Sequence, residues 1–145
     1  MRLRPWAERL EQADNAIRRV RSAAELASAL EKGFEGKFAV FIVPLKDPAE
    51  PNEIDAGAHQ QVVSPSFGIV YAVRDHADQH GGRGLDQLED LREPVRALLM
   101  GWTPDPDCIE PAGFVGGNVY AFADGAIWYL DEFRTGTVYR QESFG

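Results

Sequence analysis

Residue types that can hold a metal ion are concentrated in one short segment, residues 75–80. Asp75, His76 and His80 could offer a carboxylate and imidazoles to a divalent ion, a donor set that several metals accept. The glycine-rich residues that follow impose no geometry, and a metal site needs oriented ligands with partners behind them. A solvated loop is therefore the favoured interpretation, and a small metal-dependent hydrolase is the less favoured alternative.

Other arrangements of catalytic residue types are not predicted. Cys108 is the only cysteine, which excludes an internal disulfide and a thiolate-rich zinc site. Asp131 and Glu132 are adjacent in a strand pattern, so their side chains should point to opposite faces instead of forming a carboxylate pair. The glycine-rich residues 81–84 and 113–117 lack a phosphate-binding pattern and are interpreted as turns. We therefore expect a protein that is not an enzyme and needs no cofactor.

The length and composition fit one globular domain. The chain has 145 residues, 44% of them hydrophobic and 26% charged, and we expect a single domain over residues 1–145. The longest apolar run, residues 38–43, is too short to span a bilayer, so no membrane partner is expected. The basic residues 1–6 are not followed by the apolar stretch of a signal peptide, which predicts a protein that stays in a reducing compartment.

Charge is distributed unevenly along the chain. The net charge of −8 argues against nucleic-acid binding by the surface as a whole, because contacts to phosphates need cations. Residues 1–21 nevertheless hold six arginines against three acidic residues, a net charge of +3, which leaves −11 on the rest. Such asymmetry is typical of two surfaces with different partners, and a solvated basic helix is the plainer alternative. Residues 47–58 form an acidic loop whose length suggests function or mobility.

Three helices are predicted to position these segments. An apolar stripe at helical spacing predicts a first helix that reaches Ile17 and has the basic residues 18–21 at its carboxyl end. The pattern S-x-x-E, a capping box, begins a second helix over residues 22–32. A leucine-rich stripe predicts a third helix over residues 85–99, which Pro94 should kink or split.

Strands are predicted between and after these helices. Residues 38–43 should form a strand buried on both faces, and residues 61–74 one long strand or two collinear ones, interrupted at residues 64–65. Apolar runs on either side of residues 124–125, Asp-Gly, predict a hairpin, and residues 137–139 a last strand. The predicted fold class is α+β, a mixed sheet of about four to six strands with helices packed on it.

Aromatic residues in the second half of the chain are expected to lie mainly in the core. Some of them could instead cover a subunit interface, where tryptophan and tyrosine are enriched. These residues are Trp102, Tyr120, Trp128, Tyr129 and Phe133.

The order of these landmarks resembles the tail terminator family of Mu-like and related long-tailed phages. The most specific pieces are L-x-G-W-x-P at residues 99–104 and W-Y-x-D-x-F at residues 128–133. They follow the strand FAVFIVPL at residues 38–45, and the resemblance covers nearly the whole chain. It is loosest at the loops 47–58 and 75–84 and at the carboxyl terminus.

The resemblance implies a structural protein of the virion tail, assembled in the host cytoplasm. Such a protein forms a homo-oligomeric ring, typically a hexamer, that caps the tail tube protein, stops its polymerisation and offers a surface to a head-completion or connector protein. DNA would pass through the lumen without specific binding. Another head-tail connector or completion protein is the alternative. The residues expected at the interfaces are Arg18, Arg19, Arg21, Asp47, Glu50, Glu53, Asp55, Arg83 and Trp102.

Overall fold

Three helices and six strands make up the described part of the chain. The computed structural model describes residues 1–51, 58–74 and 82–142. The helices are α1 (Arg4–Gln12), α2 (Ala23–Lys32) and α3 (Gly82–Leu99). The strands are β1 (Val20–Arg21), β2 (Phe38–Lys46), β3 (Ala58–Val63), β4 (Ser66–Arg74), β5 (Cys108–Ala123) and β6 (Ala126–Glu142). The predicted α+β class is confirmed.

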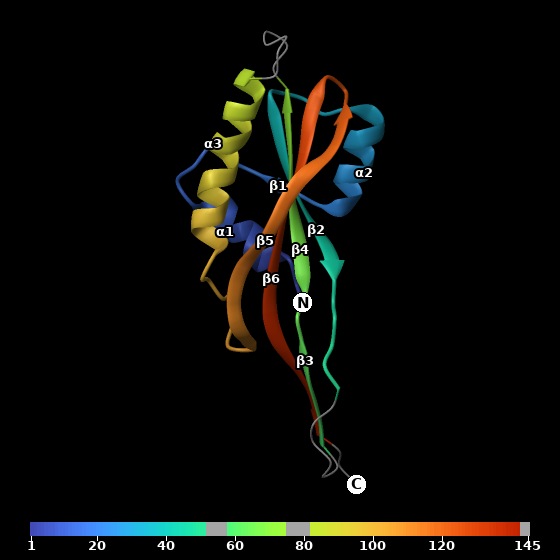
Figure 1. Cartoon of the computed structure of the whole chain (residues 1–145), viewed down its shortest axis with the longest axis vertical. Coiled ribbons are helices and arrows are strands. Elements are labelled where there is room, and N and C mark those ends of the chain that lie inside the picture. Colours follow the sequence, from blue (N-terminus) through green and yellow to red (C-terminus); the bar gives the residue numbers. More distant parts are fainter. Residues whose placement is uncertain (52–57, 75–81, 143–145) are drawn as a thin grey trace.

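All of these strands belong to one mixed sheet (Figure 1). The strand order is β1-β2-β4-β6-β3, with β5 on β6 as well. β1 runs parallel to β2, and the other pairs are antiparallel. β4 pairs with residues 126–134 of β6 and β3 with residues 137–142, so β3 and β4 are the two collinear strands that the sequence predicted. The interruption between them is held by the amide of Thr135, which donates to the carbonyl of Pro65 over 3.1 Å.

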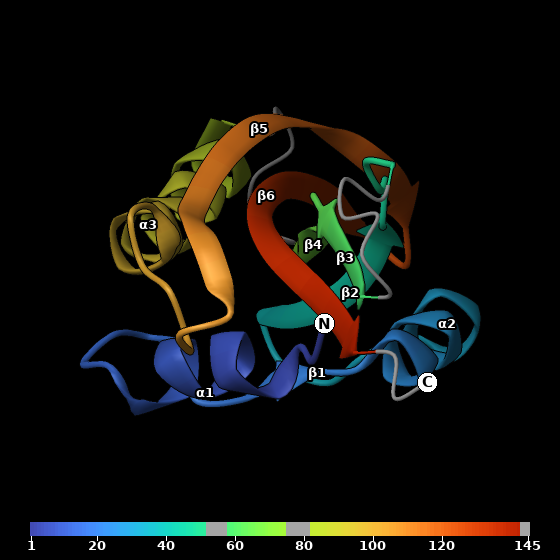
Figure 2. The same cartoon turned by 90° about the horizontal axis from the view of Figure 1, so that it is seen from below.

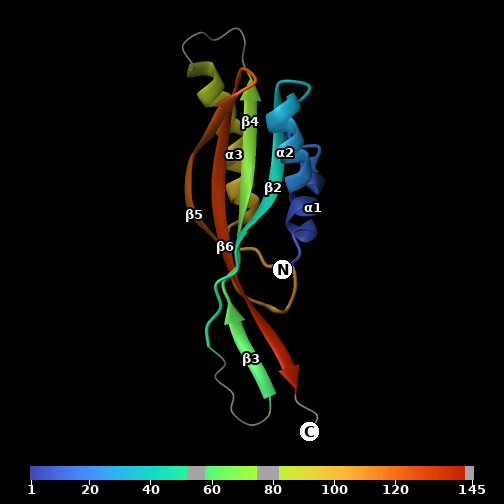
Figure 3. The same ribbon diagram turned by 90° about the vertical axis from the view of Figure 1, so that its right-hand side faces the viewer.

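Helices cover both faces of the sheet. α1 and α3 pack on one face and α2 on the other, as the view along the strands shows (Figure 2). The side view places β5 and β2 on opposite sides of β4 and β6 (Figure 3). Beyond the helices, β3 and the last part of β6 project as an arm. β4 is buried over both of its faces from Ser66 to Val73, as a central strand between two helical layers must be.

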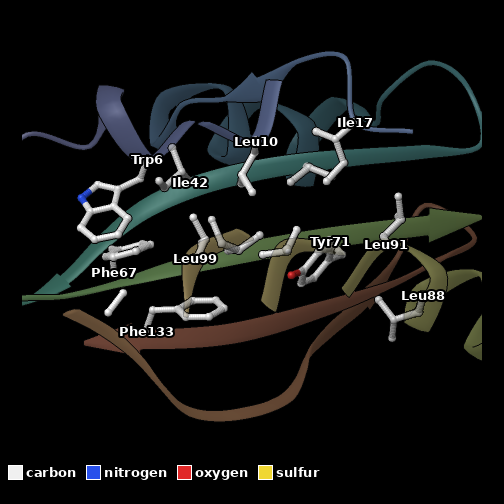
Figure 4. Packing of buried hydrophobic residues seen from close by; sticks show 14 of the residues in the cluster. Trp6, Leu10, Ile17, Ile42, Phe67, Tyr71, Leu88, Leu91, Leu99 and Phe133 are labelled. Atoms are coloured by element: carbon white, nitrogen blue, oxygen red, sulfur yellow. The ribbon is translucent and has the colours of Figure 1, made fainter. Parts of the chain in front are cut away.

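The larger core lies between the sheet and the helices α1 and α3 (Figure 4). Trp6 of α1 packs on Phe67 of β4 with ring centroids 4.9 Å apart, and Phe67 stacks on Phe133 of β6 at 5.8 Å. The third helix contributes most of its leucine stripe, which confirms the predicted inward face except at Leu85, whose side chain is exposed. Its buried apolar members are Leu88, Leu91, Val95 and Leu99.

The first helix is shorter than the sequence predicted. α1 ends at Gln12, because the side chain of Asn15 replaces helical hydrogen bonds. The side-chain oxygen Oδ1 of Asn15 accepts from the backbone amide of Ile17 over 2.7 Å. The side-chain nitrogen Nδ2 of Asn15 donates to the backbone carbonyl of Leu10 over 3.2 Å. Ile17 is still fully buried, although it lies in the irregular segment between α1 and β1. The expectation that residues 18–21 lie at a helix carboxyl end is therefore wrong.

The other two helices differ less from expectation. The capping box is present in α2: the Ser22 hydroxyl accepts from the amide of Glu25, and the carboxylate of Glu25 accepts from the amide of Ser22. α3 is one continuous helix around Pro94, so the predicted alternative of a split helix is wrong. It already begins at Gly82, which corrects the turn expected over residues 82–84.

The carboxyl-terminal hairpin is longer than predicted. Asp124 and Gly125 both have positive φ, 54° and 65°, as the predicted tight turn requires. β5 runs unbroken through residues 113–117, so the turn expected there is wrong. Register shifts within β5 show that irregular pairing absorbs these glycines. β6 continues to Glu142 and includes the last strand that was predicted separately.

Candidate functional site

A buried ion pair joins α3 to the sheet. Asp131 of β6 is fully buried, and the guanidinium of Arg92 in α3 donates to both of its carboxylate oxygens over 2.9–3.1 Å. The side chain of Arg92 is only 15% exposed. Arg92 also lies over the ring of Tyr129 at 4.5 Å. A carboxylate held bidentately in this way is fixed in position, because both of its oxygens accept hydrogen bonds.

The groups around the pair have shifted pKa values. Burial raises the pKa of Tyr71 well above its ordinary value, and the negative charge of Asp131 adds to the shift. At the outer end of the cluster, a hydrogen bond from Arg96 lowers the pKa of Glu89, with Arg92 contributing. The pKa of Arg92 is raised, because its contacts with Asp131 outweigh the effect of burial. Arg92 and Arg96 thus hold the carboxylates of Asp131 and Glu89 in ion pairs.

Gly117 of β5 lies directly against this ion pair. A Cβ atom there would stand 2.5 Å from Oδ1 of Asp131, 2.8 Å from Cε1 of Tyr129 and 3.0 Å from Nη2 of Arg92. The glycine therefore permits β5 to pass close to the pair. Glycine is needed at this position because there is no space for a side chain, and not because the backbone turns. One signal of this cluster is local: an aspartate inside an apolar strand pattern needs a partner, although the pattern does not identify that partner.

This arrangement fixes the position of α3 on the sheet. The buried carboxylate already accepts from arginine, and within residues 1–51, 58–74 and 82–142 no three His, Cys, Asp or Glu side chains gather as metal ligands. Cys108 is half-buried at the start of β5, and burial raises the pKa of its thiol, which lowers its reactivity at neutral pH. The cluster of Asp75, His76 and His80 lies outside the described residues.

The basic residues proposed for an interface surround β1. Arg18 donates to the carbonyl of Asn15 over 2.7 Å, and Arg19 forms an exposed ion pair of 2.5 Å with Glu25. Arg21 lies 5.9 Å from the ring centroid of Phe41. The three arginines thus share one edge of the sheet, beside β2, but each has a contact within the chain.

The acidic candidates are described only in part. Asp47 and Glu50 are exposed, and the amide of Glu50 donates to the carbonyl of Val62 over 2.8 Å, so this segment runs along β3 at the base of the arm. Glu53, Asp55 and the side chain of Arg83 lie outside the described residues. The two described carboxylates are thus close to the arm and away from the arginines around β1.

Trp102 joins α1 to the end of α3. Its ring meets the ring of Trp6 edge-on at 5.1 Å, and the guanidinium of Arg9 lies over it at 4.7 Å. Nε of Arg9 also donates to the carbonyl of Leu98 over 2.5 Å. Trp102 is half-buried and lines an open groove of about 380 Å³ together with Pro5. Its main contacts are internal, and one side remains accessible.

Among the described residues, exposed large apolar side chains are concentrated on β5, where the sequence indicated only Tyr120 as a candidate for a subunit interface. β5 pairs with β6 alone among the described strands, so it forms an edge of the sheet. Large apolar side chains are exposed along its length. They are Ile109 at 47%, Phe114 at 36%, Val115 at 46%, Val119 at 47%, Tyr120 at 45% and Phe122 at 74%. Exposed apolar surface together with unpaired backbone groups on an edge strand is typical of a protein contact surface.

The fold and these surfaces define a class: an α+β protein with a rigid, ion-paired interior and a long apolar strand edge suited to contacts with other chains. The family model described as phage tail terminator protein matches residues 1–143. The chain therefore belongs to the phage tail terminator family, which confirms the resemblance found in the sequence. Family membership supports a structural role in a phage tail. A search of curated proteins gave no match.

Proposed function

We propose that the protein is the subunit of a ring, a hexamer as is typical of the family, that caps the phage tail tube and stops its polymerisation. The opposite face of the ring would receive a head-completion or connector protein. The observation that carries the proposal is the family match over residues 1–143. The protein acts by assembly and not by catalysis, needs no cofactor, and becomes part of the virion tail after assembly in the host cytoplasm.

The shape of the subunit supports this role. A ring interface joins two different surfaces of each subunit, and the sheet has two dissimilar sides, the apolar edge of β5 and the basic edge around β1. The arm of β3 and β6 extends beyond the helices, where it can reach a neighbouring layer of the tail (Figure 3). No helix in the described ranges is long and apolar enough to cross a membrane.

The charge of the protein suits a passage for DNA. The net charge is −8, and Asp47 and Glu50 are exposed at the base of the arm. Acidic side chains that face the lumen would repel phosphates, so that DNA slides through without binding. The arginines near β1 then serve contacts between proteins, where opposite charges favour correct orientation and faster association.

A tube-length assay tests the proposed function. The tail tube protein of the same phage is allowed to polymerise alone, with this protein, and with an unrelated acidic protein of similar size. Electron microscopy should show short tubes with an additional ring at one end only in the presence of this protein. Native mass spectrometry of the capped tubes gives the number of subunits in the ring.

The outcomes separate the candidate functions. Tubes that keep their length and lack a terminal ring would contradict the terminator function. A ring that binds the connector protein but not the tube would favour the alternative of a connector or completion protein. Monomeric protein in the absence of tubes would contradict neither, because the tube end can serve as the template for the ring.

A further inference from the structure

One row of apolar residues crosses the sheet beneath α3. Cross-strand pairing places Phe38 of β2 beside Val73 of β4, Val73 beside Ile127 of β6, and Ile127 beside Phe122 of β5. Residues paired directly across an antiparallel sheet point to the same face, so all four side chains lie on the face that carries α3. α3 covers the middle of the row: Val73 is only 2% exposed, and a Cβ on Gly84 would stand 3.7 Å from Ile127.

The two ends of the row differ in shape. At the β5 end Phe122 is 74% exposed, the highest exposure among the large apolar side chains of the described residues. At the β2 end there is a cavity of about 230 Å³, lined by Phe38, Val73 and Leu91 with Ala16 at its rim. That volume is below the roughly 300–1,000 Å³ of sites for small molecules. It suits a single large side chain.

Polarity at the two ends follows the pattern of a protein interface. Residues 116–123 of β5 contain no charged residue, and Val119 beside Phe122 is 47% exposed on the same face. The cavity has an apolar floor, while Lys37 and Asp90 provide charges at its edge. Interfaces typically have an uncharged centre with enriched aromatic residues and a polar rim.

From this geometry we infer that Phe122 of one copy inserts into the cavity beside Phe38 of the next copy, and that this contact closes the ring. The inference rests on the proposed function and names the surfaces between its subunits. The inserted side chain, Phe122, and the cavity beside Phe38 lie on opposite sides of α3 but in the same row of the sheet. The two surfaces are different, so the contact is heterologous, and it closes a ring when the rotation between successive copies divides a full turn.

Cross-linking between copies tests this contact. In a background with Cys108→Ser, one variant carries Val119→Cys, which lies beside Phe122 on the same face and leaves it in place, and another carries Ala16→Cys. The two are mixed, added to tail tubes and treated with a short bismaleimide. The mixture should give a cross-linked dimer, and a variant with both cysteines should give a ladder up to the full ring. Ser28→Cys, exposed on α2 at the other face of the sheet, replaces Ala16→Cys in the control and should give no product with Val119→Cys.

Two disruptive variants test the same contact without cross-linker. Phe122→Asp removes the inserted side chain and Ala16→Trp fills the cavity, and each alone should weaken association of subunits at least about tenfold. Each variant keeps one intact side, so their mixture should form pairs but no rings. Circular dichroism and thermal unfolding show whether the variants remain folded.

The results distinguish failure of the contact from failure of the proposed function. Cross-links between two Val119→Cys chains, or capping of tubes by both disruptive variants at normal efficiency, would overturn the contact and leave the terminator function intact. Absence of both capping and self-association in the unaltered protein would overturn the function and the contact together.

Discussion

Asp131 is the residue whose environment is most constrained. It is fully buried, and the carboxylate is tolerated because Arg92 supplies hydrogen bonds from the opposite layer. A buried ion pair adds little to stability relative to an apolar pair of the same size, but losing one partner leaves a charge without compensation. The pair thus fixes the position of α3 on the sheet more than it increases stability.

Arg92→Ala is expected to destabilise the protein by about 3–5 kcal/mol, because Asp131 is left buried without a partner. Chemical unfolding with urea measures the loss. Glu93→Ala, an exposed change one residue further along α3, is the control and should stay within about 0.5 kcal/mol of the original protein. Adding Asp131→Asn to Arg92→Ala should recover part of the stability; a loss below about 1 kcal/mol in Arg92→Ala would contradict the buried pair.

Gly117→Ala is expected to destabilise the protein by about 1–3 kcal/mol, because the new methyl group overlaps Asp131 and Tyr129. Gly116→Ala is a matched control: the same substitution one residue earlier meets no atom within 4 Å. The two variants are compared by thermal unfolding. Equal melting temperatures would show that β5 does not approach the ion pair as closely as described.

At the scale of elements, local capping and side-chain turns determine where helices begin and end. α2 begins at its capping box, whereas α1 ends early because Asn15 accepts and donates in place of the next helical turn. The strands are less dependent on local signals. β5 keeps its pairing with β6 through several glycines, because the partner strand supplies the hydrogen bonds.

Ser22→Ala is expected to cost about 1 kcal/mol, since it removes the acceptor for the amide of Glu25 at the start of α2. Ser28→Ala makes the same substitution at an exposed position inside that helix and should be neutral or slightly stabilising, because alanine is the better helix former. Urea midpoints provide the measurement. A larger effect at Ser28 than at Ser22 would contradict the capping role.

At the scale of the whole molecule, the basic, apolar and projecting parts of the surface lie on different sides. The arginines 18, 19 and 21 lie around β1, the apolar side chains extend along β5, and the arm projects past the helices (Figure 3). A subunit with different surfaces on different sides is suited to a ring with distinct faces and an inner wall. The acidic base of the arm is the described segment that we propose for the wall of the lumen.

Asp47→Lys combined with Glu50→Lys is expected to make capped tubes retain duplex DNA at low salt and release it at high salt, because cations in the lumen attract phosphates. Co-sedimentation of DNA with tubes measures retention. Glu31→Lys with Glu35→Lys applies the same change of charge at exposed positions in and after α2. Equal retention by the control would show that total charge, and not the lumen, is responsible.

Local patterns in the sequence were sufficient for most elements. The capping box of α2, the Asp124-Gly125 turn and the apolar strand from residue 38 are read within a few neighbouring residues, and the structure has all three. The family followed from the order of such landmarks along the chain. These features are local because backbone preference and the period of burial act over one or two turns.

Tertiary structure decided the features that depend on distant residues. Arg92 contacts Asp131, which is 39 positions further along the chain. Gly117 must lack a side chain only because β5 passes close to that pair. The exposure of Phe122 follows from β5 being the edge of the sheet and from α3 ending its cover at Ile127, neither of which has a local signal. Which apolar residues are buried and which are left for a partner is set by topology, because burial depends on what packs opposite each residue.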